Sequence, residues 1–144
     1  MTDIRRIDDR ISVAPQILPE DVSDIAALGF VTIVNNRPDH EEGGQPGGDE
    51  IRAAAEAAGL GYIAIPVTPG GLSQQQVTEM AAALAGADGP VLAYCRSGTR
   101  SCNLWALASA SAGGDPETLV NKGAGAGYDL SGLRPTLDML SGKA

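Results

Sequence analysis

The chain has 144 residues, with 18 acidic against 10 basic side chains and a formal net charge of −8 at pH 7. This length suits one domain covering residues 1–144 with a sizeable core. An acidic balance disfavours nucleic acid and anionic membranes as partners, and the sequence has neither an apolar run of membrane-spanning length nor a signal-peptide pattern. We therefore expect a cytoplasmic protein and leave its oligomeric state open.

The two cysteines, Cys95 and Cys102, and the single histidine, His40, limit the chemistry further. So few cysteines fit a reducing compartment and predict no disulfide framework. With one histidine and no cysteine cluster, we expect no metal site, and no motif indicates an organic cofactor. We expect Cys102 to be a small core residue and His40 to be exposed.

Apolar periodicity predicts alternating strands and helices. In chain order, we expect a short edge strand at 11–13, a helix at 19–28, a strand at 31–34, a polar loop at 37–48, a helix at 51–58 and a strand at 62–67. Ser73 and Gln76 form a capping-box pattern that predicts the next helix, and the strand leading to Cys95 follows it. Three more helices are expected: one striped by Leu104, Leu107 and Ala108, one starting at Asp115-Pro116, and one striped by Leu130, Leu133, Leu137 and Leu140.

This alternation predicts an α/β fold with a mainly parallel central sheet and helices on both faces. Ligands gather at the carboxyl ends of the strands in such sheets. Arg37, Thr68 and Cys95 all follow predicted strands, so we expect them at that edge.

The segment 91–101 carries the strongest chemical signal. An apolar strand delivers Cys95 into a short loop that contains Gly98 and is flanked by Arg96 and Arg100. Backbone amides of residues 96–100 and the positive end of the next helix can converge there on an anion. Such a setting favours the thiolate, which is the nucleophilic form of cysteine. The alternative is an inert buried cysteine that ends a core strand.

These considerations select the candidate site residues. The catalytic candidates are Cys95 and Arg100, the anion-binding loop consists of Arg96, Ser97, Gly98, Thr99 and Ser101, and the accessory candidates are Arg37 and Asp39. Arg37 is expected either to bind an anion or to pair with Glu41 or Glu42. The Ser101 hydroxyl is a candidate hydrogen-bond donor to the thiolate. The pair Asn35-Asn36 is expected to tether the polar loop through side-chain bonds to the backbone.

The run Cys95-Arg96-Ser97-Gly98-Thr99-Arg100-Ser101 resembles the active-site loop of rhodanese-type sulfurtransferases, Cys-Arg-x-Gly-x-Arg or Thr. The organisation of the rest resembles the small dual-specificity phosphatases, in the segment 31–39 followed by Glu41 and in the strand 63–66. The combination resembles the domain-of-unknown-function 442 family, the phosphatase-like domain of beta-lactamase-hydrolase-like proteins. That resemblance implies a dual-specificity or tyrosine-phosphatase-like architecture and an activity described either as phosphatase or as sulfur transferase.

Two departures from the phosphatase pattern bear on that choice. Cysteine phosphatases place five residues between Cys and Arg, whereas four separate Cys95 from Arg100, which implies a tighter ring of amides. The stretch 66–73 also lacks the carboxylate that protonates the leaving oxygen. Only Asp39, Glu41 or Glu42 in the polar loop remain as substitutes.

We therefore expect a sulfurtransferase first. Cys95 would take sulfane sulfur from a small anionic donor such as thiosulfate or a persulfide, become a persulfide, and pass the sulfur to a thiol acceptor. The alternative is a phosphatase acting on phosphoesters through a Cys95 phosphocysteine, with Arg100 binding the phosphate. A second alternative is an anion-binding module without turnover. Neither enzyme reaction requires a cofactor.

Overall fold

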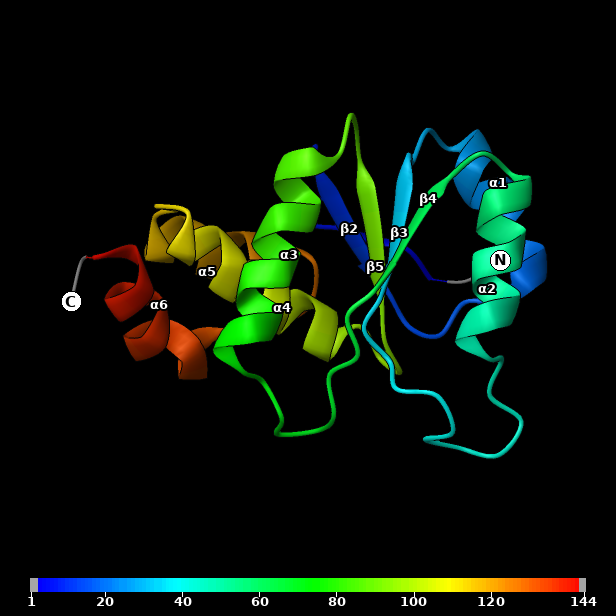
Figure 1. Cartoon of the computed structure of the whole chain (residues 1–144). Helices are drawn as coiled ribbons and strands as arrows, with labels where there is room; N and C mark the ends of the chain where they lie inside the picture. The colour runs from blue at the N-terminus through cyan, green and yellow to red at the C-terminus, as the bar shows by residue number, and fades with distance from the viewer. Residues whose placement is uncertain (1–2, 143–144) are drawn as a thin grey trace.

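The computed structural model describes residues 3–142, which form a five-stranded sheet between two layers of helices (Figure 1). The strand order is β1-β2-β5-β3-β4, and all neighbours are parallel except β1 and β2. The strands are β1 (Arg5–Arg6), β2 (Ile11–Ala14), β3 (Thr32–Asn35), β4 (Gly61–Ala64) and β5 (Val91–Tyr94). The expected mainly parallel sheet with helices on both faces is confirmed.

Within residues 3–142, eight helical segments connect or follow the strands. They are η1 (Pro19–Asp21), α1 (Val22–Ala27), α2 (Gly48–Ala57), α3 (Gln74–Gly86), α4 (Thr99–Ser111), α5 (Pro116–Gly125), η2 (Ser131–Leu133) and α6 (Arg134–Ser141), where η denotes a 3₁₀ turn. Helices α1 and α2 cover one face of the sheet, and α3 to α6 lie on the other (Figure 1). None of the helices within residues 3–142 has the length and apolar character needed to cross a membrane.

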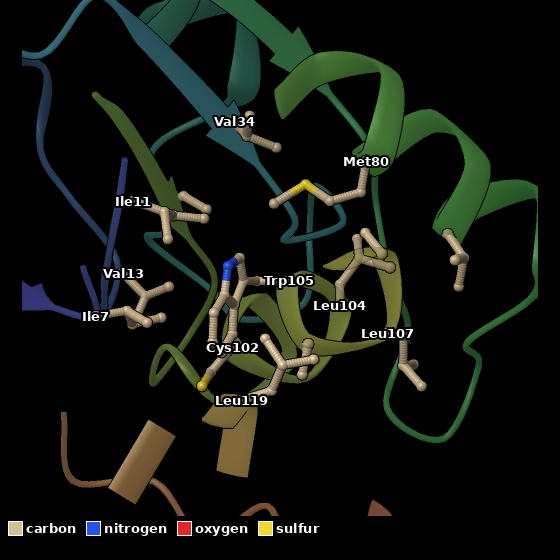
Figure 2. Packing of buried hydrophobic residues seen from close by; sticks show 14 of the residues in the cluster. Ile7, Ile11, Val13, Val34, Met80, Cys102, Leu104, Trp105, Leu107 and Leu119 are labelled. Atoms are coloured by element: carbon tan, nitrogen blue, oxygen red, sulfur yellow. The ribbon is translucent and has the colours of Figure 1, made fainter. Parts of the chain in front are cut away.

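The central strand β5 is buried on both faces because its side chains alternate between the two layers. Leu92 and Tyr94 pack with residues of α1 and α2, whereas Val91 and Ala93 pack with residues of α3 and α4. In the larger of these cores, the Trp105 ring lies beside Ile11 and Met80 between the sheet and α4 (Figure 2). Trp105 is 3% exposed and Leu104 is fully buried, as the sequence predicts for core residues.

Several predicted elements differ from the structure. The strand predicted at 11–13 spans Ile11–Ala14 and is not an edge strand, because the two-residue strand β1 pairs with its outer side. The strand predicted at 62–67 ends at Ala64, although Ile65 and Val67 still donate backbone hydrogen bonds to the carbonyl oxygens of Asn35, the last residue of β3, and of Asn36. The helix at 19–28 begins as a 3₁₀ turn at Pro19.

The predicted helix caps are confirmed. The Ser73 hydroxyl accepts the amide of Gln76, and the Gln76 side chain accepts the amide of Ser73 in return. Asp115 caps α5 by accepting the Thr118 amide at 3.1 Å. The final helix is shorter than its leucine stripe suggests, since α6 starts only at Arg134.

The register of the strands determines where the loops meet. Tyr94 lies opposite Ala14 of β2 on one side and Asn35 of β3 on the other. The chain therefore leaves all three strands at the same level, and Cys95 and Asn36 emerge side by side. The long loops after β3 and β4 also lie at this end of the sheet (Figure 1).

Candidate active site

Cys95 lies at the carboxyl end of β5 and directly before α4. Its backbone amide donates to the carbonyl oxygen of Ala14 at 3.3 Å, so the residue is held by the sheet itself. The side chain is fully buried. A thiol at this place faces the positive end of α4, and it is held by rigid structure instead of a flexible loop.

Gly98 supplies the amide that contacts the sulfur. Its N–H donates to the Sγ atom of Cys95 at 3.0 Å, and its φ of +92° is the left-handed conformation that glycine adopts without strain. Gly98 is also the residue that caps α4. The glycine in the loop is therefore required by backbone geometry, and its amide stabilises negative charge on the sulfur. Convergence of further loop amides on a bound anion stays a prediction.

Arg100 is bound by a carboxylate from the loop at residues 37–47, which we call the acidic loop. Its Nη1 and Nη2 atoms donate to the two oxygens of Glu41 at 2.6 and 2.8 Å, and Nη1 also donates to the Val67 carbonyl at 2.5 Å. This hydrogen bonding raises the pKa of Arg100, with a further contribution from the nearby Cys95 sulfur. Hydrogen bonds from Arg100 and from Arg37 lower the pKa of Glu41 to about 2. Glu41 is therefore ionised at neutral pH and forms an ion pair with Arg100.

Arg37 is buried, with a side chain only 3% exposed. Its Nε donates to Glu41 at 2.9 Å and its Nη1 donates to Gln16 at 3.0 Å. Its Nη2 lies 3.7 Å from a carboxylate oxygen of Glu42. Of the two sequence expectations for Arg37, the structure shows the pairing with Glu41 and Glu42; a contact of Arg37 with a bound anion stays a prediction.

Asn36 directly precedes the acidic loop, and its side chain bonds the chain after β4 and the first turn of α4, next to the Cys95 loop, residues 95–100. Its side-chain nitrogen donates to the Ile65 carbonyl at 2.9 Å, and its side-chain oxygen accepts the hydroxyl of Ser101 at 2.8 Å. The Ser101 proton is thus directed to Asn36, which differs from the expectation that it bonds the thiolate. The expected tethering role of Asn35-Asn36 is confirmed, because Asn35 accepts the Arg37 amide at 2.9 Å.

The remaining candidates lie at the margin of the site. Arg96 is 67% exposed and pairs with Glu42 at 3.3 Å, and the exposed hydroxyls of Ser97 and Thr99 bond each other at 3.1 Å. Asp39 is exposed and accepts the Gly48 amide at 2.8 Å at the start of α2, so its carboxylate caps that helix. His40 is exposed as expected and adopts a φ of +64°.

Cys102 is fully buried in the larger core, as the sequence predicts. Burial, with a smaller contribution from Cys95, raises the pKa of Cys102 to about 12. This thiol therefore stays protonated at neutral pH, in keeping with a structural role.

Two contacts of the site carry no signal in the sequence. Glu41 was expected only near Arg37 or as a substitute acid, yet it also holds Arg100 from 59 residues away. Tyr128 reaches the Cys95 loop from beyond α5 and donates its hydroxyl to the Ser97 carbonyl at 3.1 Å. Both contacts depend on how distant segments pack, which no local motif reveals.

Comparison with solved structures shows a phosphatase-like fold. A crystal structure from Neisseria meningitidis, assigned only provisionally as a phosphatase, is 36% identical, covers 95% of this chain and 97% of its own, and has a TM-score of 0.82. TpbA from P. aeruginosa, solved in complex with pTyr, shares the fold at 16% identity, with a TM-score of 0.65, covering 98% of this chain and 91% of its own.

The chain belongs to the family of the phosphatase-like domain of beta-lactamase hydrolase-like proteins, whose profile matches residues 3–112. A beta-lactamase hydrolase-like protein from Agrobacterium fabrum is 40% identical over 105 residues, which are 73% of this chain and 24% of that protein. The corresponding protein from Xylella fastidiosa is 38% identical over 101 residues, 70% of this chain and 23% of its own. The chain thus spans about a quarter of the length of these curated relatives. The family resemblance drawn from the sequence is confirmed.

Proposed function

We propose that this chain is a cysteine-dependent hydrolase of phosphate monoesters, with Cys95 as nucleophile and Arg100 as the group that binds the phosphate. The observation that carries the proposal is the two-point contact between Arg100 and the Glu41 carboxylate beside a buried cysteine. A guanidinium binds two oxygens of a phosphate in the same forked geometry. The family and the phosphatase-like fold support this reading more than the sulfurtransferase expected first from the sequence.

The reaction would run in two displacements at phosphorus. The Cys95 sulfur attacks the phosphorus atom, an S–P bond forms, and the P–O bond to the leaving group breaks. Water then attacks the phosphocysteine, the S–P bond breaks, and inorganic phosphate leaves as the thiolate is regenerated. Arg100 and the Gly98 amide stabilise the charge on the transferred group and on the sulfur, respectively.

Substrate choice follows from the absence of a suitable acid. The stretch 66–73 contains no carboxylate, and Glu41 has a pKa of about 2, so it holds no proton to donate at neutral pH. The carboxylate of Asp39 accepts the Gly48 amide at the start of α2, and the carboxylate of Glu42 pairs with Arg96. Substrates whose leaving group departs without protonation, such as aryl phosphates including phosphotyrosine, should therefore react best.

Sulfur transfer is the second candidate, because only four residues separate Cys95 from Arg100. A smaller ring of amides suits a single sulfur atom better than three phosphoryl oxygens. In this reaction the Cys95 sulfur attacks the outer sulfur of thiosulfate, an S–S bond forms and sulfite leaves; a thiol then takes the sulfur from the persulfide. Sulfite also departs without protonation, so the missing acid is no obstacle.

Hydrolysis of para-nitrophenyl phosphate and intact mass after thiosulfate exposure separate the candidates on one reduced sample. Phosphate release that disappears in Cys95→Ser but persists in the control Cys102→Ser supports the hydrolase. A gain of about 32 Da at Cys95 that a thiol or cyanide discharges, without phosphate release, replaces it with the sulfurtransferase. Neither activity, with phosphate binding retained in Cys95→Ser, would indicate a binding module and refute the proposal.

A further inference from the structure

Tyr128 contacts the Cys95 loop from the segment between α5 and η2, beyond the region that the family profile matches. Its hydroxyl donates to the carbonyl oxygen of Ser97 at 3.1 Å, and the residue is 9% exposed. Burial raises the pKa of Tyr128, so the hydroxyl remains protonated at neutral pH. Tyr128 is therefore a permanent donor to this carbonyl.

One peptide group links the Tyr128 hydroxyl to the Cys95 sulfur. The carbonyl of Ser97 and the N–H of Gly98 belong to the same planar unit, which does not twist internally. Tyr128 binds its oxygen end, and the Sγ atom of Cys95 accepts its N–H end at 3.0 Å. Fixing the carbonyl direction therefore fixes the N–H direction toward the sulfur.

Gly98 makes this support necessary. Glycine has wide conformational freedom on both sides of φ = 0°, so the Ser97–Gly98 peptide would rotate easily without an external contact. The Tyr128 hydroxyl lies only 2.1 Å from the position that a Cβ atom on residue 98 would take. The Tyr128 hydroxyl thus occupies the space that a side chain on residue 98 would need, so the tyrosine at this place requires a glycine at position 98.

We propose that Tyr128 is a positioning residue that stabilises the Cys95 thiolate by orienting the Ser97–Gly98 peptide. The inference rests on the proposed function only in taking Cys95 as the reactive group, which holds for phosphoryl and sulfur transfer alike. Arg100 and Cys102 of α4 also interact electrostatically with the sulfur, and Arg5 of β1 lies 5.5 Å from the Tyr128 ring centre. None of these three residues changes in the test below.

The test is the pH dependence of Cys95 alkylation by iodoacetamide, followed by peptide mass mapping. Tyr128→Phe keeps the ring and removes the donor, so the midpoint of the rate profile should rise by about 0.5–1 pH unit. The control Tyr62→Phe removes a hydroxyl that accepts from Asn35 at 2.9 Å, and it should leave the midpoint unchanged.

A second variant keeps the test decisive if Tyr128→Phe does not fold. Replacing Tyr128 with 3-fluorotyrosine preserves the shape and makes the hydroxyl a stronger donor, so the midpoint should fall. Profiles of the Tyr128 variants that coincide with the wild type would overturn this inference alone. A wild-type Cys95 that reacts no faster than Cys102, which is equally buried, would overturn it together with the proposed function.

Discussion

The Glu41 carboxylate offers a direct measure of how strongly the acidic loop is held to the Cys95 loop. Glu41→Gln keeps the shape of the side chain and removes the negative charge that pairs with both Arg37 and Arg100. A carboxyl whose pKa falls from 4.5 to about 2 on folding stabilises the folded state by about 3 kcal/mol when ionised. The side chain is 17% exposed, and solvent screening reduces the expected effect to about 1–2 kcal/mol.

The sign of the pH dependence follows from the lowered pKa. Glu41 stabilises the folded protein fully above about pH 4.5, and this contribution is lost as the pH falls toward about 2. The difference in unfolding free energy between wild type and Glu41→Gln should therefore be largest at neutral pH and shrink through this window.

Urea unfolding followed by the fluorescence of Trp105, the single tryptophan, measures this difference at each pH. Glu79→Gln is the matched control, because Glu79 only accepts a bond from Gln75 on the exposed surface of α3. A wild type that is no more stable than Glu41→Gln at pH 7, or a difference that stays constant down to pH 3, would refute the reasoning.

Two further substitutions test the Cys95 loop. Gly98→Ala places a Cβ atom 2.1 Å from the Tyr128 hydroxyl in a left-handed conformation, whereas Gly29→Ala has the same sign of φ and open space. Thermal unfolding should show Gly98→Ala to be destabilised by about 1–3 kcal/mol more than Gly29→Ala; equal losses would contradict the clash. Ser101→Ala leaves the buried oxygen of Asn36 without its donor and should lower the unfolding free energy by about 1–3 kcal/mol. An unchanged midpoint in urea would show that this hydrogen bond contributes little.

The fold was largely predictable because its signals are local. The apolar run 91–94 and the glycine at position 98 mark a strand, a turn and a helix start within a few residues. The two-residue strand β1 could not be found in this way. It consists of two exposed arginines, and only its pairing with β2 makes it a strand.

The candidate site was predictable only where it is contiguous in sequence. Cys95 and its loop share one motif, and Arg37 was expected at the same edge of the sheet because it follows a strand. The Glu41–Arg100 pair joins residues 59 positions apart, and the Tyr128–Ser97 bond joins residues 31 positions apart. Such contacts are set by the packing of whole elements, so composition and periodicity do not specify them.

Because of the hydrogen bonds of Asn36, we expect the strand ends of the site and the exposed part of the acidic loop to unfold locally at different free energies. Its backbone amide donates to Tyr94, its backbone oxygen accepts from Val67, and its side chain contacts Ile65 and Ser101. The strand ends beside Cys95 are thereby bonded to the centre of the sheet, and their amides should exchange with solvent only when the whole domain unfolds. The exposed residues 39–44 are held instead by side-chain contacts such as the Glu41–Arg100 pair, so excursions that admit a ligand to the buried sulfur can arise there while the sheet stays intact.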